Sequence, residues 1–312
     1  MDNLKTQVYN NYDSNELMYS LYDELGQPEI LRDMFFASDK PYKYKNILLY
    51  PVTMDLCMIF YILADCLILR KNTTGDIEAI KRTYLDYLIY LAQCGNYQYL
   101  KCLEKLLLMV LHKNEFALDE NGNPILGENN FAVRSVEIVG RNGKPYIYIL
   151  KDKIHLPFKG VSDLDYDIID SNDFDIIRGI ICEQNNIELV DEKIHPDKLQ
   201  KIEEWEELQV KKNKDRICSL EEQKAILKAI KGWDTEQIDK TTIRSFYTEI
   251  ERYGMLIDYE IANILRPNMD KKDQQKIISW LGKVKKQTKL EKITCDYDKF
   301  NDKFEPNKTN KQ

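Results

Sequence analysis

The chain has 312 residues, of which 31 % are charged, and its 45 basic and 52 acidic side chains give a formal net charge of -7 at pH 7. This length suffices for one large or two modest domains, and the acidic balance argues against a general attraction to nucleic acid. The seven cysteines have no CxxC spacing and fall mostly in apolar runs, which is typical of reduced thiols rather than of a disulfide framework or a zinc site. The polar first residues, Met1 to Lys5, carry no signal-peptide pattern, so we expect a cytoplasmic protein.

Residues 1–114 are predicted to form a helical bundle with an N-terminal lead-in. After a polar start, leucines at helical spacing predict a first helix over residues 15–25. Residues 47–52 then form a short strand-like lead-in to the bundle, which Pro51 confines to an edge position.

The segment 54–70 is expected to be the central helix of this bundle. It is apolar almost all the way round, a pattern that predicts burial on every side. Spanning a bilayer takes roughly 20 apolar residues. This run is shorter and contains Asp65, so we expect no membrane segment. Two amphipathic helices, over residues 76–93 and from the break at Gly95 to His112, are expected to pack beside it.

Residues 115–160 change to a strand-like period and are predicted to form an inserted β-meander. Two Asn-Gly pairs, at residues 121–122 and 142–143, are strong hairpin signals. Each pair should join two neighbouring strands, and a further strand is expected over residues 154–158.

Residues 161–282 are predicted to form a C-terminal helical module, and residues 283–312 a disordered basic tail. The module opens with a helix over residues 172–184, for which Ser171 is the expected cap. Further helices are expected from Pro196 to about residue 212, from the capping box of Ser219 and Glu222 to Gly232, and over residues 241–265 with a bend at Gly254. The chain is thus predicted to be a mainly helical α+β protein.

Six aspartates between residues 163 and 175 are the arrangement that most invites a metal ion. They are Asp163, Asp165, Asp167, Asp170, Asp173 and Asp175. An EF-hand loop counted from Asp163 needs Gly at its sixth and Glu at its twelfth position, where this chain has Ile168 and Phe174. We therefore expect a solvated loop whose carboxylates favour the N-terminus of the following helix. No metal or cofactor is predicted, while metal binding by this cluster is left open by the sequence alone.

No catalytic residues are predicted, and we expect a protein that is not an enzyme. The chain contains no P-loop, dinucleotide-binding, zinc-protease or hydrolase motif. Its three histidines, at positions 112, 155 and 195, have no His or Cys partner at metal-ligand spacing. A Cys–His nucleophilic pair stays an alternative, because such partners need not be close in sequence.

Several stretches of the chain carry a resemblance to known proteins. They are ILLYPVTMDLCMIFYILADCLILRKN at 47–72, TYLDYLIYL at 83–91, NDFDIIRGIICEQNNIEL at 172–189 and SLEEQKAILKAIKGWDTEQIDKTTIRSFYTEIERY at 219–253. Together they resemble tail-morphogenesis proteins from phages and prophages of low-GC Gram-positive bacteria. The last stretch resembles the helical module of tail assembly chaperones, in which a capping Ser or Thr starts xLxEQ and GW precedes IxxLTIRxF. Dedicated chaperones of this kind are often smaller, which leaves a baseplate-associated protein open.

The resemblance implies a non-enzymatic tail assembly protein of the host cytoplasm that binds tape-measure, tube or baseplate proteins. We predict that its contact surface lies in the C-terminal module, at Trp233, Ile243, Phe246 and Tyr247. One alternative is a structural baseplate or tail subunit that stays in the virion. Another is a nucleic-acid-binding regulator, since residues 270–312 hold twelve lysines against seven acidic residues. Self-association into a homo-oligomer is left open.

Overall fold

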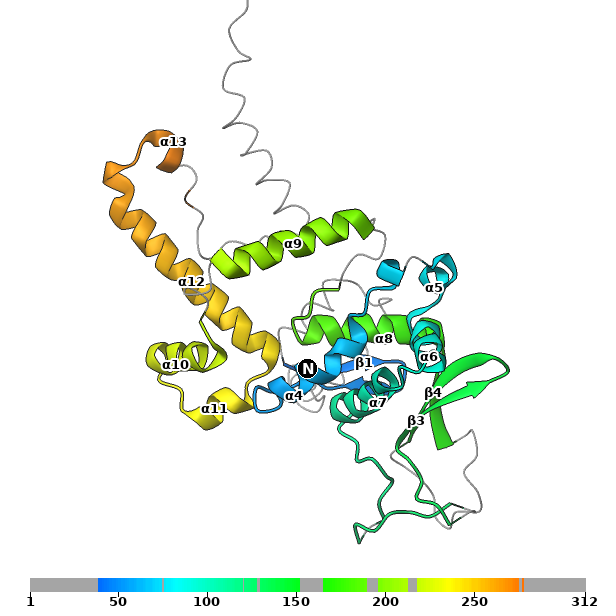
Figure 1. Ribbon diagram of the computed structural model, residues 1–312. Coiled ribbons are helices and arrows are strands. Elements are labelled where there is room, and N and C mark those ends of the chain that lie inside the picture. Colours follow the sequence, from blue (N-terminus) through cyan, green and yellow to red (C-terminus); the bar gives the residue numbers. More distant parts are fainter. Residues whose placement is uncertain are drawn as a thin grey trace, which may run out of the picture. The chain divides into compact units, whose positions relative to one another are not determined.

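Figure 1 shows the computed structural model of the chain. It describes residues 39–74, 76–119, 121–127, 130–151, 165–189, 196–212, 218–274 and 277. The helix predicted over residues 15–25, the strand predicted over residues 154–158 and the tail predicted over residues 283–312 lie outside these described residues. The described part is mostly helical with small antiparallel sheets, which confirms the mainly helical α+β class.

The chain divides into two compact units. The described residues of the first unit fall in 39–71, 76–189 and 235–247, and those of the second in 72–74, 196–212, 218–234 and from 248 onward. These units differ from the predicted division at residues 114, 160 and 282. The bundle and the β-meander share one unit, which also takes in two parts of the predicted C-terminal module.

The first unit begins with a hairpin of β1 (Tyr42–Tyr44) and β2 (Ile47–Leu49). Strand β2 confirms the predicted extended lead-in. Its end residues, Ile47 and Leu49, are buried, while Leu48 between them is exposed. The short strand β1 was not predicted. Its tyrosines alternate with Lys43, and both rings are buried.

Helix α4 (Cys57–Ala64) is the centre of the predicted bundle, but it is only eight residues long. The chain continues as 3-10 turns in η1 (Asp65–Leu67) and η2 (Lys71–Thr74). One side of α4 is buried through Cys57, Phe60, Leu63 and Ala64. The prediction of burial on every side is wrong, because Met58, Ile59 and Ile62 are exposed.

Helices α5 (Ile77–Lys81) and α6 (Tyr84–Gln93) replace the single helix predicted over residues 76–93. The break lies at Thr83, which has an extended backbone. Its side-chain oxygen caps α6 by accepting a hydrogen bond from the amide of Asp86. Helix α7 (Gln98–Val110) contacts α4, α6 and η1. It buries Leu103, Leu106, Leu107 and Val110, and full burial of one such side chain stabilises the fold by about 1.5–3 kcal/mol.

The three-stranded antiparallel sheet has the order β3 (Val136–Arg141), β4 (Lys144–Leu150) and β5 (Tyr166–Ile169). Asn142 and Gly143 form the two-residue turn between β3 and β4 with φ values of 53° and 74°. Two successive positive φ angles define the type I′ turn that Asn-Gly favours, so this predicted hairpin is confirmed. Helix α7 contacts β3, while α6 and α8 contact β4, which places the sheet against the helices.

Helix α8 (Ser171–Gln184) confirms the helix predicted at the start of the C-terminal module. Its cap is Asp170 rather than Ser171, because the carboxylate of Asp170 accepts hydrogen bonds from the amides of Asn172 and Asp173 at 2.9 and 2.8 Å. The first unit also contains α11 (Thr235–Lys240) and the first turns of α12 (Ile243–Leu265).

The second unit contains α9 (Pro196–Lys212), α10 (Leu220–Lys231), the remainder of α12, η5 (Arg266–Asn268) and α13 (Lys271–Gln274). The predicted capping box of Ser219 and Glu222 starts α10, and Gly232 ends it with a φ of 67°. Lys231 links α10 to α12 through an ion pair of 2.7 Å with Glu249. Helix α12 runs through Gly254 without a break. In the described part of the chain, no helix has the length and apolar content needed to cross a membrane.

Candidate protein-binding site

The start of α4 is held by backbone hydrogen bonds to the segment that joins α11 and α12. The amide of Met54 donates to the carbonyl of Thr241 at 2.9 Å, and the amide of Ile243 donates to the carbonyl of Val52 at 2.9 Å. Thr53 pairs with Thr242 in an isolated antiparallel bridge. Because these bonds tie the start of α4 to the start of α12, the orientation of α4 within the first unit is fixed.

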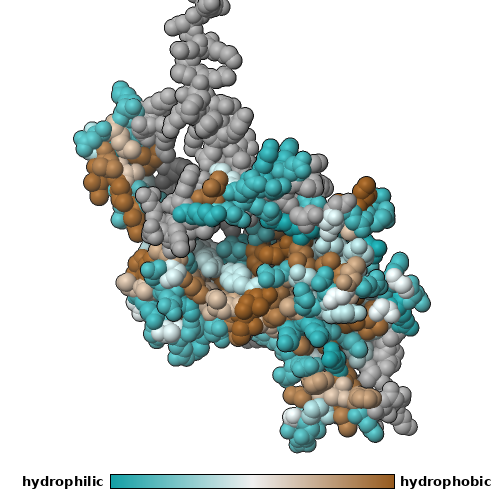
Figure 2. Space-filling view, viewed as in Figure 1, coloured by the Kyte–Doolittle hydropathy of each residue, from teal (hydrophilic) through white to brown (hydrophobic). Residues whose placement is uncertain are grey.

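Helix α4 presents apolar side chains to solvent. Met58, Ile59 and Ile62 are 61 %, 52 % and 66 % exposed, and their spacing places them on one side of the helix. We call these three residues, with the neighbouring Leu56, the α4 face. Figure 2 shows hydrophobic residues gathered over α4 near the middle of the view. Single exposed apolar residues are ordinary on protein surfaces, whereas contiguous ones mark surfaces that bind other proteins.

Tyr61 and Tyr247 join α4 to the first turns of α12. Burial raises the pKa of the Tyr61 hydroxyl above its ordinary value. The neighbouring Tyr247, which shares a hydrogen bond with Tyr61, raises it further. The ring of Tyr247 packs edge-on against Phe246, with their centroids 5.3 Å apart. Since Phe246 is fully buried, these aromatic contacts anchor α4 to the core of the first unit.

The four residues predicted as a contact surface lie in different environments. Ile243 and Phe246 are fully buried, which favours a core role for both side chains. Tyr247 is half-buried beside Tyr61. Trp233 belongs to the second unit, where the ammonium of Lys231 lies 5.2 Å from its ring. The structure thus brings three of the four together, and a contact role for Trp233 and Tyr247 stays a prediction.

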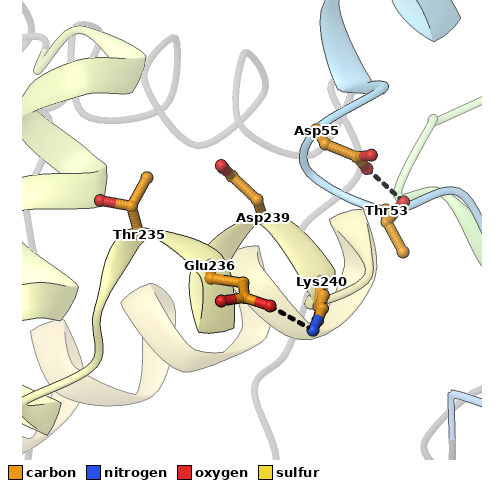
Figure 3. A pocket seen from close by; sticks show the side chains of 6 residues that line it. All are labelled: Thr53, Asp55, Thr235, Glu236, Asp239 and Lys240. Atoms are coloured by element: carbon orange, nitrogen blue, oxygen red, sulfur yellow. Dashed lines mark hydrogen bonds and ion pairs between the residues drawn. The ribbon is translucent and has the colours of Figure 1, made fainter.

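An acidic hollow of about 480 Å³ opens at the start of α4 (Figure 3). It is lined by Thr53, Asp55, Thr235, Glu236, Asp239 and Lys240. Lys240 pairs with Glu236 at 2.6 Å, and the hydroxyl of Thr53 donates to the carboxylate of Asp55. Three carboxylates and one ammonium make the hollow negative. Among the described residues, no group of three His, Cys, Asp or Glu side chains is arranged to hold a metal ion. Because Asp55, Glu236 and Asp239 line it at the start of α4, the hollow gives the α4 face an acidic border.

The aspartates of the predicted acidic cluster position α8. Asp163 lies outside the described residues. The carboxylate of Asp173 accepts from the hydroxyl of Tyr44 at 2.8 Å, and that of Asp175 accepts from the amide of Tyr84 at 3.0 Å. The cap by Asp170 and the place of Asp173 in the first turn of α8 confirm that this part of the cluster favours the N-terminus of the following helix. The predicted solvated loop is wrong for Asp167, which lies in strand β5.

A Cys–His nucleophilic pair was the alternative that the sequence left open. His112 stacks on Tyr50 with ring centroids 4.0 Å apart, and burial lowers the pKa of its imidazole. Burial raises the pKa of the Cys182 thiol to about 12 and also raises that of the Cys66 thiol. Both thiols are therefore protonated and weakly nucleophilic at neutral pH. His155 and His195 lie outside the described residues.

The α4 face, its aromatic anchor and its acidic border all belong to the first unit and come from α4, α11 and α12. They combine an apolar centre with a negative edge. That combination is the chemistry of a surface for another protein, because apolar contact supplies affinity and charge supplies selectivity. No protein-family model, no curated protein and no solved structure matches this chain.

Proposed function

We propose that this protein is a non-enzymatic assembly factor for phage tails, and that it binds other tail proteins through the α4 face. The observation that carries the binding proposal is the exposure of Met58, Ile59 and Ile62, each more than half exposed on one short helix. Burying apolar surface stabilises a complex by about 25 cal/mol for each Å² removed from water, before the costs of association. The assignment to phage tails rests on the sequence resemblance.

The partner should present apolar side chains with a basic edge. Asp55 and Asp65 lie at the two ends of α4 and are exposed. The acidic hollow at the start of α4 adds the carboxylates of Glu236 and Asp239. Lysines or arginines beside the partner's apolar residues would complement these carboxylates. The unbranched side chain of Met58 adapts to different apolar shapes, which suits a chaperone-like protein that holds more than one tail protein.

The test is an affinity purification of the tagged full-length chain from phage-producing cells, followed by mass spectrometry. We expect recovery of a tape-measure, tube or baseplate protein. The double variant Ile59→Ser/Ile62→Ser should weaken the binding of that protein about tenfold or more, since truncating central apolar contacts costs on the order of 1–2 kcal/mol. Circular dichroism should be unchanged, because both side chains are exposed.

Ile77→Ser is the matched control, because Ile77 on α5 is 66 % exposed, as Ile62 is. It should leave the recovered partner unchanged. Equal loss in both variants, or no loss in the double variant, would contradict binding through the α4 face. Recovery of no tail protein at all would remove the assembly role.

Purified phage particles separate the assembly factor from a structural subunit of the baseplate. An assembly factor should be missing from finished particles, whereas a structural subunit would be found there in fixed proportion to the other tail proteins. A nucleic-acid-binding regulator would instead be recovered with nucleic acid, and its affinity would fall steeply as the salt concentration rises.

A further inference from the structure

The C-terminal half of α12 carries a second exposed apolar surface, in the second unit. Its residues are Ile257, Ile261, Ile264 and Leu265, which we call the α12 stripe, and they are 47 %, 49 %, 75 % and 48 % exposed. Figure 2 shows hydrophobic residues over this end of α12. Because these four side chains are contiguous along one helix, they differ from the single exposed apolar residues that are ordinary on protein surfaces.

The stripe has the spacing of a coiled-coil seam. Ile257, Ile261 and Ile264 follow one another at intervals of four and three residues, which correspond to the d, a and d positions of a heptad. Gly254 lies at the preceding a position, and a Cβ built on it meets nothing within 4 Å. The seam is therefore open over residues 254–264, a length of about 15 Å at 1.5 Å per residue. A second helix fits a surface with this period, because apolar side chains of each helix fill the spaces between those of the other.

Acidic side chains border the seam on both sides. In the same heptad, Glu251 and Asp258 occupy e positions and Glu260 occupies a g position, and all three are exposed. The e and g positions from Glu251 to Leu265 contain no lysine or arginine. Since the residues at e and g set the choice of partner and its orientation, these carboxylates decide which helix the seam can accept.

A second copy of α12 is a poor occupant of the seam. Whether two such helices run parallel or antiparallel, the carboxylates at their e and g positions would come close to one another, and like charges there oppose pairing. Lysines or arginines at the same positions of another helix would instead compensate the carboxylates. Charge complementarity therefore selects a helix that is apolar along its seam and basic on both flanks.

We propose that the α12 stripe is a docking site for a basic amphipathic helix of another protein. The two apolar seams supply the affinity, and the lysines or arginines of the partner lie beside Asp258 and Glu260. The acidic border rejects acidic helices, including a second copy of this chain. The stripe belongs to the second unit and the α4 face to the first, so this docking site is independent of the binding proposed for the α4 face.

Fluorescence anisotropy of a labelled synthetic peptide with the full-length chain tests the docking site. The Lys peptide consists of roughly three heptads with leucine at a and d, lysine at e and g, and alanine or glutamine elsewhere. The Glu peptide has glutamate in place of every lysine. We expect saturable binding of the Lys peptide that weakens as the salt concentration rises, and no binding of the Glu peptide.

A double variant of the stripe shows where the Lys peptide binds. Ile261→Ser/Ile264→Ser should weaken its binding about tenfold or more, because the variant truncates two apolar contacts of the seam. Circular dichroism should be unchanged, since both side chains are exposed. Ile59→Ser/Ile62→Ser on the α4 face is the matched control and should bind the Lys peptide as the parent chain does.

A charge-reversal variant tests the acidic border without changing the seam. Asp258→Lys/Glu260→Lys should bind the Lys peptide several-fold more weakly than the parent chain does, and it should gain binding of the Glu peptide. This exchange of preference keeps the test decisive, because a variant that merely failed to fold would lose the Lys peptide without gaining the other one.

Four results would overturn the proposal. They are no saturable binding of the Lys peptide, equal affinity for the two peptides, undiminished binding by Ile261→Ser/Ile264→Ser, and equal loss in the α4 control. A dimer of the free chain in size-exclusion chromatography that dissociates in Ile261→Ser/Ile264→Ser would assign the stripe to a second copy and overturn it as well. None of these results bears on the tail protein expected at the α4 face, so the two proposals can fail separately.

Discussion

The guanidinium of Arg178 lies 3.5 Å from the centre of the Tyr84 ring, and its Nε donates to the carbonyl of Leu67 at 2.6 Å. One side chain of α8 thereby joins α6 and η1. Arg178 is only 9 % exposed and Tyr84 is fully buried. The contact is therefore shielded from water, where a cation over an aromatic ring is worth more than at the surface.

Arg178→Lys should destabilise the first unit by about 1–3 kcal/mol, because lysine keeps the charge but loses the planar stack and the hydrogen bond from Nε. Thermal unfolding of the variant checks this as a lower melting temperature. Arg266→Lys, at an exposed position after α12, is the control and should melt as the parent does. Equal melting temperatures for all three proteins would show that the stacked arginine contributes nothing.

The free energy of unfolding should fall as the pH is lowered, because the carboxyl of Asp173 becomes protonated. Burial opposes its ionisation, but hydrogen bonds from Lys45 and Tyr44 outweigh burial and hold the pKa of this carboxyl below its ordinary value. A carboxyl with a lowered folded-state pKa stabilises the fold above its unfolded pKa, about 4, and loses that contribution as the pH falls through the folded-state pKa. Asp173→Asn should therefore be destabilising at pH 7 and flatten the decline in stability below about pH 4. Urea unfolding at several pH values measures both effects, with Asp65→Asn at an exposed position as control.

Two glycines of the second unit should respond to alanine with opposite signs. Gly254 lies inside α12, and a Cβ built on it meets nothing within 4 Å. Gly254→Ala should therefore stabilise by about 0.5–1 kcal/mol, the difference in helix propensity. Gly232 ends α10 at a φ of 67°, so Gly232→Ala should destabilise by about 1 kcal/mol or more. The same sign for both, measured by thermal unfolding, would contradict the backbone conformations described above.

Thiol labelling should separate the cysteines by burial. Cys94 and Cys218 are exposed, while Cys66 and Cys182 are buried and burial raises the pKa of both buried thiols. A maleimide reagent at pH 7 should modify the exposed pair rapidly and the buried pair only after unfolding, as peptide mapping will show. Rapid labelling of Cys66 or Cys182 in the folded chain would revive the alternative of a cysteine-dependent enzyme.

The elements that the sequence predicted correctly depend on short-range chemistry. The turn at Asn142 and Gly143 and the capping box of Ser219 and Glu222 are both decided by neighbouring residues. The cap of α8 fell one residue from its predicted place, because Asp170 and Ser171 are both good cap residues and only the three-dimensional contacts choose between them.

The candidate binding site on α4 could not be predicted from the sequence, and the reason is physical. An all-apolar run such as α4 does not reveal how many neighbours pack round it, so the exposure of Met58 and Ile62 is invisible until the other helices are in place. The family resemblance led us to predict that Ile243 and Phe246 belong to a contact surface. An apolar stripe has the same spacing whether it faces a partner or its own core, and here it faces the core.

The pairing of Met54 with Thr241 also sets an order of events during synthesis. The first unit needs residues 235–247, which leave the ribosome long after the hairpin and α4. At about 5–20 residues per second, the chain from position 54 to position 243 takes roughly 10 to 40 s to make. For that time the start of α4 lacks its backbone partners, and apolar α4 is available to chaperones of the cell or to neighbouring nascent chains. Nonsense mutants that end before residue 241 should therefore aggregate or be degraded rather than persist as a folded fragment.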